Sequence, residues 1–172
     1  MLLKPSFTEY PEYYGRYINN LPDSGILDNY EKQSDEVLEL FNNLTEDQLK
    51  YKYAPDKWSV IEVLGHLIDS EIIMAYRALT YARQDKSNLQ MYDHDKYVET
   101  GFFKDIESSL VINHFSAVRK SNISLFKTFT NEMWLQNGLT GGKEFTARAI
   151  PYIIVGHTNH HISVIKDKYL WK

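Results

Sequence analysis

Apolar residues recur at steps of three and four through long stretches of this sequence, which is the spacing of one face of an α-helix. The clearest stretch follows Ser59-Val60-Ile61-Glu62, a capping box in which the serine accepts an amide proton and the glutamate reaches back. Gly65 interrupts this stretch and indicates a close contact with another helix or with a neighbouring site. No segment sustains the period of two that is typical of a strand. The spacing predicts an all-α protein. The apolar positions of this stretch are Ile61, Leu64, Leu67, Ile68, Ile72, Ala75 and Leu79.

The same periodicity recurs in residues 23–44, 105–131 and 146–169. Asp23 or Ser24 can cap the first of these segments. A bundle arises when such helices bury their apolar faces against one another. The sequence therefore predicts a four-helix bundle with a long crossover between its second and third helices.

Residues 84–104 form this crossover, and they are mostly polar. Long ordered connections are often functional. Residues 1–22 hold three prolines and four tyrosines, which predicts an irregular N-terminal arm packed on the body by its aromatic side chains. No Gly/Ser-rich linker, charge block or internal repeat follows the arm, so we expect a single domain over residues 1–172.

Composition excludes several classes of protein. The chain has 19 basic and 23 acidic residues, a formal net charge of −4, whereas nucleic-acid binders usually carry a basic excess. It has no cysteine, so disulfides, thiolate metal sites and a cysteine nucleophile are excluded. Met1-Leu2-Leu3-Lys4-Pro5 is too short for a signal peptide, and no apolar run is long enough to span a membrane. We expect a cytoplasmic protein that binds neither nucleic acid nor membrane.

Six histidines and 23 carboxylates remain for chemistry. His157 and His161 are one helical turn apart, about 6 Å along the axis, and continue the apolar row of the last predicted helix. His66 lies inside the second predicted helix. Two imidazoles on one helix and a third from a facing helix can converge on a divalent metal at about 2.0–2.1 Å. His160 is an alternative to His161, and each histidine has the alternative of a hydrogen-bonded place in the core.

A nearby carboxylate could serve as a base or orient a ligand. Asp69, three residues after the first of these histidines, is the first candidate, although a salt bridge or a cap would equally explain it. Asp93 in the crossover could reach the mouth of the site. Arg77 is expected to pair with Glu71 or Asp69 rather than to contact an anionic substrate. His94 has no partner at ligand spacing and is interpreted as a loop residue.

At these residues the sequence resembles the DinB/YfiT-like superfamily of metal-binding four-helix bundles, over residues 25–170. The order and separation of several short motifs carry the resemblance. The motifs are Lys57-Trp58-Ser59, Gly65-His66-Leu67-Ile68-Asp69-Ser70-Glu71, Tyr76-Arg77, Tyr92-Asp93-His94-Asp95 and Gly156-His157-Thr158-Asn159-His160-His161.

The resemblance implies an up-down-down-up bundle, frequent homodimers and a three-histidine site for a divalent metal at His66, His157 and His161. Zinc or nickel is the expected ion. Members of the superfamily include thiol transferases that activate a low-molecular-weight thiol at the metal, a thiol-dependent maleylpyruvate isomerase, and proteins regarded as metal-dependent hydrolases. The expected function is thus a hydrolase or a thiol S-transferase acting on a small molecule. The alternative is a non-catalytic metal-binding or dimerisation bundle associated with stress response.

Overall fold

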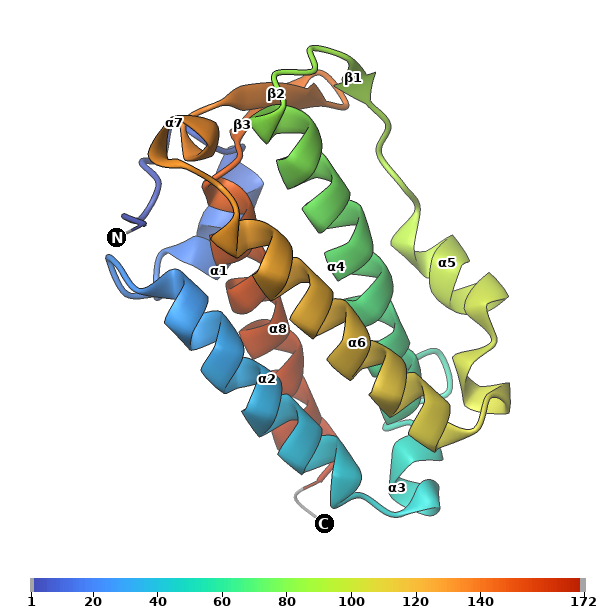
Figure 1. The fold of residues 1–172 in the computed structure, drawn as a ribbon. Helices are drawn as coiled ribbons and strands as arrows, with labels where there is room; N and C mark the ends of the chain where they lie inside the picture. The colour runs from blue at the N-terminus through green and yellow to red at the C-terminus, as the bar shows by residue number, and fades with distance from the viewer. Residues whose placement is uncertain (1, 171–172) are drawn as a thin grey trace.

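Four long helices form the body of the protein in a computed structural model that describes residues 2–170 (Figure 1). They are α2 (Ile26–Asn42), α4 (Val60–Ala82), α6 (Ser108–Lys127) and α8 (Ala149–Lys168). Helices α4 and α6 run in one direction and α2 and α8 in the other, as Figure 1 shows. Each of α4 and α2 packs against both α6 and α8. The predicted four-helix bundle and its up-down-down-up order are confirmed.

Two of the helix starts follow the capping pattern of the sequence. At the start of α4, the Glu62 carboxylate accepts a hydrogen bond from the Ser59 amide at 2.7 Å, and Ser59 Oγ accepts one from the Glu62 amide. A second capping box, Thr45 with Gln48, opens the short helix α3 (Glu46–Lys50). These boxes satisfy amide groups that the first turn of a helix leaves without partners.

The start of α2 differs from the prediction. Its N-cap is Gly25, and no side chain caps the helix, so the prediction that Asp23 or Ser24 would cap it is wrong. Ser24 instead forms an isolated antiparallel bridge with Leu3. Backbone pairing with the N-terminal segment therefore takes the place of a side-chain cap.

The N-terminal segment is more regular than the irregular arm expected for residues 1–22. It contains a 3₁₀ turn, η1 (Glu12–Tyr14), and a four-residue helix, α1 (Gly15–Ile18). A helix this short does not form alone; α1 is held by its contact with α8. At that contact a Cβ on Gly156 would lie 2.0 Å from the carbonyl oxygen of Tyr17. Only a glycine lets the two backbones come so close.

The crossover is also structured. It contains a short strand, β1 (Asn88–Leu89), a helix, α5 (His94–Gly101), and a 3₁₀ turn, η2 (Phe103–Asp105). The ring of Phe103 lies on Gly65 of α4, where a Cβ would be 2.2 Å from a ring carbon. A close contact thus exists at this glycine, but its partner is a ring of the crossover's 3₁₀ turn rather than another long helix, and it fixes the end of the crossover on α4.

Residues 137–146 form a β-hairpin. Strands β2 (Asn137–Thr140) and β3 (Lys143–Thr146) pair antiparallel, and β1 adds to β2 in parallel. The short helix α7 (Asn131–Trp134) precedes them. Gly141 and Gly142 make the turn with positive φ angles of 57° and 74°, which suits a tight hairpin. The sheet lies at the end of the bundle where α4 ends and α8 begins (Figure 1).

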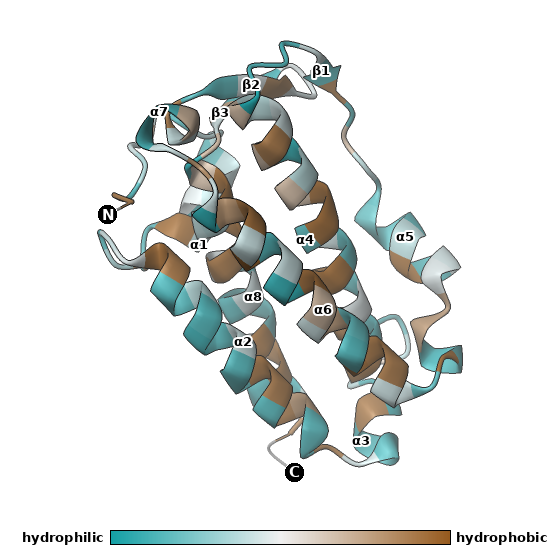
Figure 2. Ribbon diagram, viewed as in Figure 1, coloured by the Kyte–Doolittle hydropathy of each residue, from teal (hydrophilic) through white to brown (hydrophobic). Residues whose placement is uncertain are grey.

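Hydrophobic residues line the inner faces of the long helices, and hydrophilic ones face outward (Figure 2). The buried apolar residues form two clusters, one towards the sheet and one towards α3. Each long helix contributes apolar residues to both clusters, and along each helix buried polar residues separate the two sets. Within residues 2–170, no helix combines the length and the apolar character needed to cross a membrane. The buried polar residues between the clusters include Gln33, Ser34, Glu71, Arg119, Asn122 and Thr158.

Candidate metal centre

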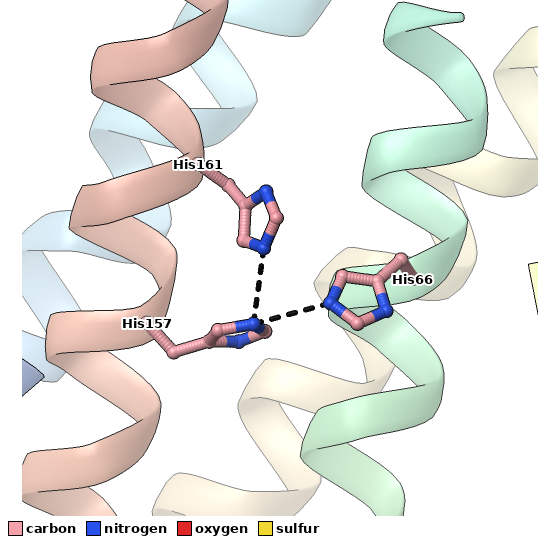
Figure 3. Close-up of side chains that lie close together, drawn as sticks. All are labelled: His66, His157 and His161. Atoms are coloured by element: carbon pink, nitrogen blue, oxygen red, sulfur yellow. Dashed lines mark hydrogen bonds between the residues drawn. The ribbon is translucent and has the colours of Figure 1, made fainter. Parts of the chain in front are cut away.

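Three histidine side chains converge between α4 and α8 (Figure 3). His66 projects from α4, and His157 and His161 project from successive turns of α8. The Nε2 atom of His157 lies 3.1 Å from Nε2 of His66 and 3.1 Å from Nε2 of His161. One ring nitrogen from each residue lies within 4.8 Å of the other two.

This spacing fits a tetrahedral divalent ion. Ligands at 2.0–2.1 Å from such an ion are roughly 3.3 Å apart, close to the 3.1 Å between Nε2 of His157 and each of its neighbours. Three protein ligands leave one or more coordination positions for water or substrate. His160, the alternative to His161, is exposed and lies outside the group that could hold an ion.

Burial keeps the three imidazoles neutral. It lowers the pKa of His66 to about 3 and that of His161 to about 4, and the positive charge of nearby histidines acts in the same direction. The same causes hold the pKa of His157 well below its usual range. Neutral imidazole is the form that coordinates a metal. The site is therefore in its binding form at neutral pH.

We expect the metal-free protein to lose stability as the pH falls from about 6.5 to about 5. Histidines of the unfolded chain take up protons below about 6.5, whereas His66 and His161 in the folded protein do so only near 3 and 4. The unfolded state therefore binds more protons in this window, and the free energy of unfolding decreases. Urea denaturation at several pH values measures the slope. His161→Asn should make the dependence of the unfolding free energy on pH shallower. An unchanged slope in that variant would contradict the claim that His161 is held neutral by burial.

Aromatic rings surround the three histidines. The Tyr17 ring of α1 meets the His157 ring edge to face, with 5.3 Å between centroids. The Trp58 ring, just before α4, lies 4.9 Å from the His66 ring. His94 lies 5.7 Å from the same ring. The expectation that His94 is a loop residue is wrong, because it is the first residue of α5. The Tyr92-Asp93-His94-Asp95 motif of the family resemblance contains His94 and could have indicated that this residue lies near the site.

The histidines open on a cavity of about 460 Å³ that follows α4 and α8 towards the hairpin. One end is lined by the three histidines together with Trp58 and His94. Such a cavity is of the size that accepts a small molecule. The other end is lined by Tyr14, Met74, Arg77, Met91, Lys143 and Phe145.

Neither predicted carboxylate is among the residues that line this cavity within the described chain. Asp69 is half-buried, and burial raises its pKa while the charge of His114 opposes the shift. Asp93 is exposed, and its Oδ1 accepts a hydrogen bond from the Lys96 amide at 3.0 Å. Asp93 thereby caps the helix that begins at His94. The catalytic roles of both aspartates stay predictions.

The pairing predicted for Arg77 is wrong. Glu71 pairs with Arg119 of α6, with 2.6 Å between Oε1 and Nη2. Residues six apart on a helix lie about 120° apart around its axis, so Glu71 and Arg77 face different directions. Arg77 instead donates to the carbonyl oxygen of Gln90 at 3.0 Å and contacts the sulfur of Met74 at 3.8 Å.

The fold and the site together define a helical bundle with a histidine cluster of the kind that binds metals. The sequence model of the DinB superfamily matches residues 29–165. The chain therefore belongs to the DinB superfamily.

Two solved structures share this fold. YfiT from Bacillus subtilis, described as a probable metal-dependent hydrolase with an unusual four-helix bundle topology, is 20% identical with a TM-score of 0.71, over 95% of this chain and 90% of that one. A mycothiol-dependent maleylpyruvate isomerase is 9% identical with a TM-score of 0.70, over 85% of this chain and 61% of that one. No curated protein matches the sequence. At these identities the likeness shows the fold alone.

Proposed function

We propose that this protein is a metal-dependent enzyme that acts on a small molecule, with a divalent ion held by His66, His157 and His161. The observation that carries the proposal is the convergence of three neutral imidazoles at one end of a cavity. Zinc or nickel is the proposed ion, because imidazole suits both.

A divalent ion with three neutral ligands lowers the pKa of a bound water towards about 7 and favours the thiolate of a bound thiol, so either can act as a nucleophile. The chain has no cysteine; a thiol would have to arrive as a cosubstrate. One structural neighbour is described as a probable metal-dependent hydrolase and the other as a mycothiol-dependent isomerase. The first description supports water as the nucleophile, and the second supports a low-molecular-weight thiol.

The chain's own residues would position the reaction. His94 lines the cavity beside His66, and we propose it as the group that accepts the proton of the nucleophile. Asp93 would act on His94 indirectly, by capping α5. Trp58 covers one side of the histidines and Tyr17 another, which limits access of bulk water. A homodimer and a cytoplasmic location remain part of the proposal.

Metal analysis combined with an activity panel tests this function. The purified protein should hold about one zinc or nickel ion per chain. It should also turn over one electrophile with a low-molecular-weight thiol, or hydrolyse an ester or amide without one. His94→Gln should keep the metal and lose most of the turnover, whereas His114→Gln, on the exposed face of α6, should keep both. A folded protein with no affinity for divalent ions would exclude the proposal. If the absorption spectrum of the cobalt-substituted protein does not change when azide is added, the ion has no exchangeable ligand, and the non-catalytic alternative is favoured.

A further inference from the structure

Arg77 is a buried cation without a carboxylate partner. Its exposed fraction is 2%, yet within residues 2–170 no acidic group lies within ion-pair distance of its guanidinium. A guanidinium has five N–H donors, and only Gln90 and Met74 receive hydrogen bonds from it. No fully buried side-chain nitrogen in the described chain lacks a partner. Nη1 and Nη2 each have one of these partners, and Nε, which has none, therefore stays accessible from the cavity that Arg77 lines.

The immediate surroundings of Arg77 are aromatic and neutral. Its charge acts on the phenols of Tyr14, Tyr81 and Tyr92, but burial is the larger effect and raises the pKa of each. These phenols thus stay protonated and cannot serve as counter-ions. The guanidinium lies 5.9 Å from the centre of the Tyr92 ring, within cation–π distance. A buried charge without a counter-ion is costly, and an anionic ligand would remove that cost.

The cavity as a whole is positively charged, although the chain carries a net charge of −4. Arg16 and Lys143 also line it, and both are exposed. Its single acidic residue, Glu71, is neutralised by Arg119. A cleft lined by one sign of charge concentrates ligands of the opposite sign.

Arg77 and the histidines occupy opposite ends of the cavity. Arg77 follows His66 by eleven residues on α4, which is about 16 Å of helix rise. Between them, the walls are mainly apolar, with Met74 from α4 and Ile153 and Ile154 from α8. A ligand that reaches both ends must be elongated and must have an apolar middle.

We propose that this cavity binds an elongated organic acid, with its carboxylate on Arg77 and its reactive end at the histidines. The assignment of the reactive end rests on the function proposed above. The carboxylate subsite does not, because it is made by Arg77 alone. A planar carboxylate can accept two parallel hydrogen bonds from a guanidinium, so the subsite favours a carboxylate over a neutral group of the same shape.

Calorimetric titration with octanoate and its neutral counterpart octanamide tests the subsite. We expect the zinc-loaded protein to bind octanoate about 10-fold more tightly than octanamide, as a charge-assisted hydrogen bond predicts. Arg77→Met should abolish this preference, and Arg77→Lys should leave part of it. The matched control is Arg83→Met, at the exposed end of the same helix, which should leave it unchanged.

The preference should also persist in His161→Ala, which removes a proposed metal ligand but not Arg77. This arm separates the subsite from the ion: a preference that persists without metal comes from Arg77, whereas a preference lost with the metal comes from a carboxylate bound to the ion and would overturn the subsite. An unmodified protein with no affinity for zinc that still prefers octanoate would instead contradict the metal-dependent function and leave the subsite standing. Equal binding of the two probes, a preference that survives in Arg77→Met, or no binding of either probe at millimolar concentration would overturn the subsite.

Discussion

Replacing His157 by alanine is expected to weaken zinc binding by about 100- to 10,000-fold. Zinc bound through protein side chains is worth roughly 10–16 kcal/mol, so one ligand of three accounts for about 3–5 kcal/mol. His157 is the central member of the cluster, because its Nε2 lies 3.1 Å from Nε2 of both His66 and His161. Without it, the two remaining rings lack the nitrogen that lies between them. Competition with a fluorescent chelator measures the loss.

The matched control is His114→Ala, because His114 is an exposed histidine of α6 outside the cluster. That variant should retain full affinity for zinc. Circular dichroism should show His157→Ala to be folded, since its helix is anchored by apolar residues towards its start, including Ile150 and Ile154. If His157→Ala binds zinc as tightly as the unmodified protein, the ion does not bind at this cluster.

The positions of these histidines were accessible from sequence because helical spacing governs them. The i,i+4 relation of His157 and His161 fixes their common face within one helix. His66 comes from a different helix, and only its place inside that predicted helix and the family resemblance indicated it. His94 was missed because its position depends on the path of the crossover. That path is fixed by contacts far apart in sequence, such as the Phe103 ring on Gly65.

The difference between local spacing and contacts far apart in sequence also explains which parts of the fold were predicted. The four long helices have apolar faces that repeat over many turns, so their spacing is evident. Strands β2 and β3 have four residues each, too few to show a period of two. They depend on tertiary contacts, including the pairing of Leu139 with Asn88. The partner of Glu71 was predicted wrongly because local spacing on α4 gave no information on α6.

The polar layer between the two apolar clusters is centred on Arg119. This side chain is fully buried and donates to Glu71 of α4, Gln33 of α2 and Thr158 of α8. Glu71 also accepts a hydrogen bond from Tyr30 at 2.8 Å. One guanidinium thus connects all four long helices. Because Thr158 follows His157 directly, the layer also holds α8 in position at the histidine cluster.

Removing Arg119 should therefore destabilise the whole bundle. Arg119→Met leaves the Glu71 carboxylate buried without its cation, which typically costs about 3–5 kcal/mol. Urea denaturation at pH 7 should show a lower free energy of unfolding by that amount. The control is Lys127→Met, which removes an exposed ion pair between α6 and Glu31 of α2, and such pairs contribute only about 0–1 kcal/mol.

The double variant Arg119→Met with Glu71→Gln distinguishes the buried charge from the loss of packing. Because glutamine carries no charge, it removes the uncompensated carboxylate while keeping an oxygen that can accept from Tyr30. We expect the double variant to regain roughly half of the stability that Arg119→Met loses, through the absence of that charge. A double variant no more stable than Arg119→Met would mean that Arg119 stabilises the bundle through Gln33 and Thr158. The ion pair with Glu71 would then contribute little to the fold.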